Sequence, residues 1–213
     1  GRLPAQPAGN GAAPCAALSS WPTMETLLSI ALGLGLAAAA GLRVFVPVFG
    51  ASLAAHLGVL PLSPSFAWVG TLPALIAFGT ATALEIGAYY VPWLDHALDV
   101  VASPAAVIAG VVASAAVITD LPPLVTWAVA LIGGGGAAGI VQMLSVGARV
   151  KSAVTTGGLG NPVVATGETV GAIALTAMTL LVPLVALVVC IVFVFLLARF
   201  VWRRRNRSAA TSS

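Results

Sequence analysis

The chain has 213 residues, of which 60% are hydrophobic and only 7% are charged, and its formal net charge is +3. A soluble domain carries about 25% charged residues, so this composition excludes a soluble globular protein and indicates an integral membrane protein. Apolar runs of roughly 20 residues, the length that crosses a bilayer as a helix, recur along almost the whole chain. We therefore expect one all-α polytopic unit of about five to seven membrane helices, some of them broken or re-entrant.

The N-terminal segment, residues 1–23, is rich in Ala, Pro and Gly, and a strong apolar pattern opens only at Met24. We interpret 1–23 as a disordered N-terminal extension and Met24 as the natural start. The run 27–40 shares features with a signal-peptide core. Because Glu25 precedes it and apolar sequence resumes after Arg43, a retained first helix is the better interpretation.

The first apolar region, residues 27–60, is about 34 residues long. As one helix it would measure roughly 50 Å, which is too long for a single straight crossing of a 30 Å hydrocarbon core. Gly41 and Pro47 offer places to break or kink it, and Arg43 lies between them. Arg43 is too far from either end of the region to reach water, so it needs a partner or a cavity.

The second span, residues 66–93, has aromatic residues at both ends, as expected for a helix that meets two membrane interfaces. These residues are Trp68, Tyr89, Tyr90 and Trp93. Glu85 lies inside this span, and we expect it or Glu168 to pair with Arg43 or to carry a coupling proton. Pro92 is expected to end the helix.

Residues 93–104 predict a short amphipathic helix at the membrane interface. Asp95 and Asp99 are one helical turn apart and His96 lies between them, so the three are weak candidates for metal ligands. The solvated face of an interfacial helix explains them better. We accordingly predict no metal site and no cofactor.

The next two apolar segments, 104–119 and 124–148, predict a helical hairpin around a tight turn. Four consecutive glycines, Gly133–Gly136, lie in the middle of its second helix and mark either a close helix crossing or a break. Arg149 and Lys151 are expected to end that helix.

The stretch 155–162, TTGGLGNP, is uncharged and rich in turn-forming residues, although it separates two long apolar segments. One interpretation is an ordinary surface turn. The other is a non-helical break at membrane depth, with Asn161 as the N-cap of a helix that begins at Pro162. If Arg149 and the C-terminus share one side, segment 152–164 must cross in broken form.

The stretches 31–47 and 130–162 each contain an Ala/Gly-rich helix, a glycine break and a proline, which hints at a weak internal repeat. After the second of them the apolar sequence runs on to residue 202. We expect 24–202 to form a single transmembrane domain.

The last segment, 203–213, begins with a cluster of arginines beside the final apolar run. Arginines in this place anchor a membrane protein with that end in the cytoplasm. We therefore expect a basic cytoplasmic tail and a multi-pass protein of the cell (inner) membrane. A nucleic-acid-binding arm is the alternative, but the cluster needs no second explanation, and we predict no nucleic-acid partner.

Three motifs together resemble one known family. They are AAAAGLRVFVPVF (37–49), LDHALDVVASPAAVIAG (94–110) and TTGGLGNPVV (155–164). In order and spacing they are similar to the bacterial membrane proteins catalogued as Domain of Unknown Function 4126, over about residues 24–197. The resemblance implies a multi-pass membrane protein and no established activity.

The sequence contains no catalytic triad, nucleotide-binding loop or zinc motif, so we expect no enzyme. The leading hypothesis is a transporter or channel for a small solute, with an anion as the best candidate. We expect Arg43 and the amides of the stretch 155–161 to form its binding site. The residues of that stretch are Thr155, Thr156, Gly157, Gly158, Gly160 and Asn161.

Two alternatives stay open. A non-transporting scaffold or assembly partner would use Gly133–Gly136 as a packing seam. A metal-dependent membrane enzyme, the weaker alternative, would use Asp95 and Asp99. Apart from the lipid bilayer, the expected partners are a small anionic solute and further copies of the chain in a homo-oligomer.

Overall fold

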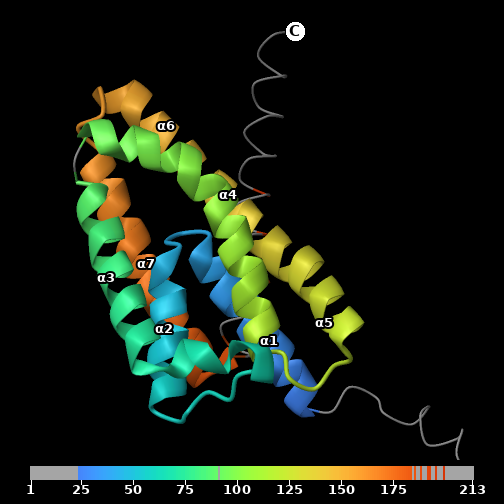
Figure 1. The fold of residues 1–213 in the computed structure, drawn as a ribbon. Coiled ribbons are helices and arrows are strands. Elements are labelled where there is room, and N and C mark those ends of the chain that lie inside the picture. The colour runs from blue at the N-terminus through green and yellow to red at the C-terminus, as the bar shows by residue number, and fades with distance from the viewer. Residues whose placement is uncertain are drawn as a thin grey trace, which may run out of the picture.

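The computed structural model describes residues 24–90 and 92–183, together with a few positions between 185 and 199. The side chains of 92–99 lie outside this description, as do the predicted extension 1–23 and the tail 203–213. Within the described ranges the protein is helical and contains no strand, which confirms the all-α fold class. Figure 1 shows a hairpin of short helices enclosed by longer helices on either side.

The enclosed hairpin consists of α1, Met24–Ala40, and α2, Phe45–His56. With 17 and 12 residues these helices are roughly 25 and 18 Å long, too short for either to span the bilayer alone. They start and end at the same end of the bundle and meet at a tip in its interior (Figure 1). The predicted break near Gly41 is confirmed, and the first apolar region is a re-entrant hairpin.

Four longer helical segments surround the hairpin. The 3₁₀ helix η1, Pro64–Gly70, bends by 68° into α3, Leu72–Ala88. The others are α4, Pro92–Val117; α5, Pro123–Val129, with the π-helix η2, Ala130–Gly134, and α6, Gly135–Thr156; and α7, Asn161–Leu181. In the described part three helices are long and apolar enough to span a membrane, and the bent pair makes a fourth. The exact number of crossings stays a prediction.

Two predicted helix boundaries are wrong. The sequence predicted an interfacial helix over 93–104 and a separate crossing over 104–119, but α4 continues through Pro104. A proline inside a helix removes one hydrogen bond without separating the two halves when tertiary contacts hold both. The helix expected to end at Arg149 and Lys151 likewise runs on to Thr156.

The four-glycine run lies where the α5–η2–α6 segment crosses α4. A Cβ atom on Gly110 of α4 would come within 2.6 Å of Ala138 Cβ and 2.9 Å of the Gly134 carbonyl oxygen. The backbones therefore approach more closely than any side chain would permit. The predicted close crossing is confirmed, and the π-helix η2 interrupts the α-helix at the same place.

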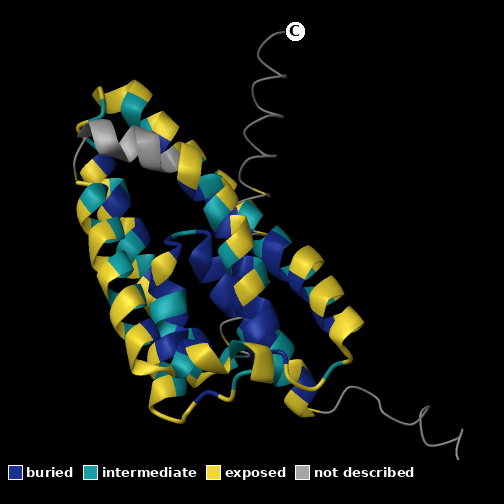
Figure 2. Cartoon of the chain, viewed as in Figure 1, coloured by how far each residue is buried: buried dark blue, intermediate teal, exposed yellow. Residues whose placement is uncertain are grey.

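Burial follows this arrangement. Figure 2 shows buried residues concentrated on the hairpin and on the helix faces that meet it. The second half of α1, Gly35–Ala40, is buried throughout. Large apolar side chains on the outer faces, such as Ile76, Leu84 and Val170, are exposed. A surface of this kind is stable in hydrocarbon and not in water, so the chain is a membrane protein.

The closest backbone approach yields a first prediction. A Cβ atom on Gly41 would lie 2.5 Å from the Ala138 carbonyl oxygen, whereas nothing lies within 4 Å of one on Gly136. Gly41→Ala should lower the free energy of unfolding by about 1–3 kcal/mol because the hairpin tip must move away from α6. Gly136→Ala should leave it unchanged or raise it. Unfolding in mixed detergent micelles measures both, and equal effects would contradict this packing.

Candidate functional site

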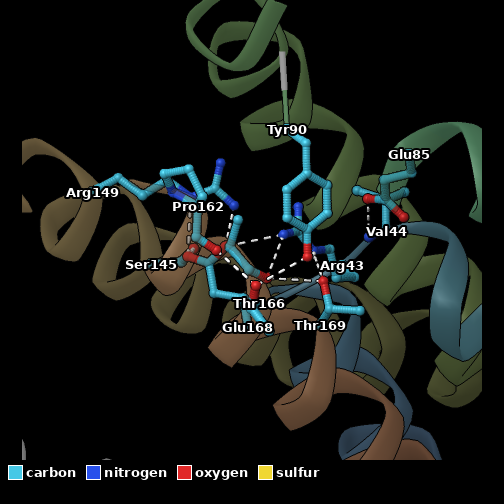
Figure 3. Close-up of polar contacts among 11 residues, drawn as sticks. Arg43, Val44, Glu85, Tyr90, Ser145, Arg149, Pro162, Thr166, Glu168 and Thr169 are labelled. Atoms are coloured by element: carbon cyan, nitrogen blue, oxygen red, sulfur yellow. Dashed lines mark hydrogen bonds and ion pairs between the residues drawn. The ribbon is translucent and has the colours of Figure 1, made fainter. Parts of the chain in front are cut away.

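Arg43 lies at the tip of the re-entrant hairpin, in the break between α1 and α2, and the residue is 1% exposed. Its Nε donates a hydrogen bond to Thr169 Oγ1 at 3.0 Å, and its Nη2 donates to the Ala165 carbonyl oxygen at 2.7 Å. Both acceptors belong to α7 (Figure 3). The third nitrogen, Nη1, is buried and has no hydrogen-bond partner among the described residues.

Glu168 on α7 receives donors from a second arginine. Arg149 Nε donates to Glu168 Oε1 at 3.0 Å, and Arg149 Nη2 donates to Oε2. Ser145, one helical turn before Arg149 on α6, donates to Oε1 through its hydroxyl. Arg43 Nη2 lies 3.6 Å from Oε2. One carboxylate is therefore shared by two guanidinium groups and one hydroxyl (Figure 3).

Both guanidinium groups also contact one aromatic ring. The guanidinium carbon of Arg43 lies 3.8 Å from the ring centroid of Tyr89, and that of Arg149 lies 4.0 Å from it. Cations over an aromatic face are attracted by its quadrupole, most strongly where water is excluded. We call the five residues that meet here the central cluster: Arg43, Tyr89, Ser145, Arg149 and Glu168.

The central cluster is buried. Arg149 is 3% exposed, Tyr89 5% and Glu168 7%. An uncompensated charge in the membrane interior costs several kcal/mol, so the contacts between Glu168 and the two arginines matter for stability.

Glu85 on α3 binds backbone groups, whereas Glu168 binds side chains. Its two carboxylate oxygens accept the backbone N–H groups of Val44 at 2.7 Å and Phe45 at 3.0 Å (Figure 3). These amides open α2, whose own first residues provide no side-chain cap. Glu85 therefore caps a helix N-terminus inside the bundle and complements its positive dipole end.

The stretch 155–161 forms a turn between α6 and α7. Thr155 and Thr156 are the last residues of α6, and their hydroxyls donate to carbonyl oxygens of their own helix. Gly157 and Gly158 have left-handed backbone angles, φ 63° and 90°, which favour glycine after a helix C-terminus. The amide of Gly160 donates to Thr156 Oγ1.

Two expectations for this stretch are corrected. Helix α7 begins at Asn161 with Gly160 as its N-cap, so Asn161 is not the N-cap. Segment 152–164 does not cross in broken form, since a turn of four residues, 157–160, joins the two helices. The turn lies at one end of the bundle, close to the start of α4 (Figure 1).

Arg43 and the turn are thus held by different parts of α7. The hydrogen bonds of Arg43 are to Ala165 and Thr169, one and two helical turns beyond Asn161. Of the two carboxylates expected near Arg43, Glu168 lies in its ion pair and Glu85 binds backbone amides. The structure describes no contact of Arg43 with 155–161.

The proposed metal ligands Asp95, His96 and Asp99 belong to α4, but their side chains lie outside the described residues. Among the side chains that are described, no three His, Cys, Asp or Glu residues come together as a metal site would require.

Sequence reasoning missed three members of the central cluster. The sequence pattern predicts Tyr89 and Tyr90 as interfacial aromatics, yet Tyr89 is buried and only Tyr90 is exposed. It predicts Arg149 as a charge at the end of a helix. One signal was present: Ser145 and Arg149 are four residues apart, which places both on one face of a helix.

A comparison with protein families finds one match. The family described as Domain of unknown function (DUF4126) matches residues 30–203. The chain belongs to this family. The match includes every residue of the central cluster, the capping carboxylate Glu85 and the turn 157–160. No curated protein and no solved structure matches the chain.

The shared carboxylate yields a second prediction. Glu168→Gln removes the anion between two buried guanidinium groups and should lower the free energy of unfolding by about 3–5 kcal/mol. Glu25→Gln, at an exposed position in the first turn of α1, is the matched control and should change it by no more than about 0.5 kcal/mol. Detergent unfolding compares the two variants, and similar values would show that the buried pair is not needed for stability.

The aromatic contacts yield a third prediction. Tyr89→Leu removes the ring that contacts both guanidinium groups, whereas Tyr89→Phe keeps it. Tyr89→Leu should therefore be less stable than Tyr89→Phe by about 2 kcal/mol. The same unfolding measurement decides this, and equal stability of the two variants would rule out a cation–π contribution.

Proposed function

We propose that the protein is a membrane transporter or channel for a small anion and that the central cluster is its binding site. The observation that carries this proposal is a buried guanidinium group with an unused donor. Arg43 and Arg149 both contact the carboxylate of Glu168, and Nη1 of Arg43 has no hydrogen-bond partner among the described residues. A small anion would accept a hydrogen bond from this donor.

The re-entrant hairpin supports the same proposal. Transporters commonly place the N-termini of half-membrane helices next to their anionic substrates, because unpaired amides and the helix dipole attract negative charge there. The N-terminus of α2 lies beside Arg43 in the interior, where Glu85 covers it. Glu85 and Glu168 are therefore the residues through which we propose that a proton is coupled to anion binding.

The alternatives have less support. A scaffold that used Gly133–Gly136 as a seam for another protein would need that seam to be accessible. Gly134 already packs against Gly110 and Ser114, and Gly133 packs against Leu34.

Our proposal for localisation follows from the arginines after residue 202: the C-terminus is cytoplasmic and the membrane is the bacterial inner membrane.

Anion flux through reconstituted protein tests the proposal. Proteoliposomes should take up chloride, phosphate, formate or acetate faster than protein-free vesicles do, and Arg43→Gln should lower that flux at least tenfold. Lys151→Gln, which removes an exposed cation near the end of α6, is the matched control and should transport normally. No anion flux above protein-free vesicles, or undiminished flux in Arg43→Gln, would refute an anion pathway through this site.

A further inference from the structure

The donors around Glu168 fit the shape of a carboxylate. Arg149 presents Nε and Nη2 to two different oxygens of the same group. These two parallel N–H donors, the fork of Arg149, match a planar anion that has two oxygens on one carbon. A spherical halide cannot accept both hydrogen bonds in this geometry. Ser145 adds a third donor on Oε1, and Arg43 Nη2 approaches Oε2 from the tip of the hairpin.

The surroundings limit the size of any occupant. The side chains of Arg43 and Arg149 are both almost fully buried, and Tyr89 covers both guanidinium groups. A group that takes the place of the Glu168 carboxylate must therefore be of similar size. A short aliphatic acid meets this limit.

The carboxylate of Glu168 can leave its hydrogen-bond donors without a change in the backbone. Its carboxylate is held by side chains only, namely Arg149, Ser145 and Arg43, and no described backbone amide binds it. Glu85, by contrast, is held by two backbone amides. Side-chain donors can exchange one carboxylate acceptor for another without unfolding a helix.

From these observations we infer that the transported anion is a small monocarboxylate and that Glu168 occupies its site when no solute is bound. This inference rests on the proposed function and names its substrate class. An incoming carboxylate first meets the unused Nη1 of Arg43 and then replaces Glu168 on the fork of Arg149. Glu168 and the solute therefore compete for one set of donors.

The first test removes the competitor. Glu168→Ala deletes Cγ and the carboxylate group. These are two carbons and two oxygens, the same heavy atoms that acetate contains. Acetate should therefore raise the thermal unfolding midpoint of this variant at concentrations at least tenfold lower than wild type requires. Formate should act similarly and butyrate should not, because it exceeds the space. Chloride and phosphate at equal ionic strength are the controls.

Two further variants separate binding from general stabilisation by salt. Arg149→Gln combined with Glu168→Ala lacks the fork and should lose the response to acetate. Glu168→Gln keeps a side chain in the site and should also be unresponsive. If Glu168→Ala responds to acetate no more than these two variants do, the inference is wrong.

The second test uses the wild-type protein and applies even if Glu168→Ala does not fold. In proteoliposomes at alkaline pH, where very little of each acid is in the protonated form that crosses lipid unaided, formate and acetate should be transported at least tenfold faster than chloride or phosphate. Preference for chloride or phosphate would overturn the inference while leaving anion transport in place. If no anion is transported, the proposed function fails, and the acetate response of Glu168→Ala decides whether the site is built for a carboxylate.

Discussion

One carboxylate held between two arginines joins the re-entrant hairpin to the helices around it. Glu168 comes from α7, Arg149 from α6 and Arg43 from the tip of the hairpin, while Tyr89 adds α3 through its ring. Each charge would be costly alone in hydrocarbon, so each requires the others to be in place. The helices that carry them are consequently fixed relative to one another, which apolar packing alone specifies poorly in a membrane.

The re-entrant hairpin is what makes such a cluster available. A continuous helix over 27–60 would satisfy every backbone group internally and would leave no amide for Glu85. The break at Gly41–Val44 frees the amides that Glu85 caps and turns Arg43 toward α7. Glycine is required at position 41 because Ala138 and Val141 of α6 pack directly against it.

The sequence predicted the fold class, the break near Gly41 and the close crossing at Gly133–Gly136, because apolar run length and small-residue clusters act locally. It also singled out Arg43 and Glu168 as residues that need partners in hydrocarbon. It did not predict which partners they find. Tyr89 and Arg149 have the residue types expected at interfaces, and only the packing of α3 and α6 against the hairpin turns both inward.

Arg43 and its hydrogen-bond acceptors on α7 lie far apart in the sequence, so the ribosome makes them at different times. Arg43 binds residues that follow it by 122 and 126 positions in the chain. At a translation rate of about 5–20 residues per second, the hairpin emerges roughly 6–25 s before α7 exists. During that interval the guanidinium lacks both of its α7 acceptors. The packing around the hairpin tip can therefore be completed only after α7 has been made.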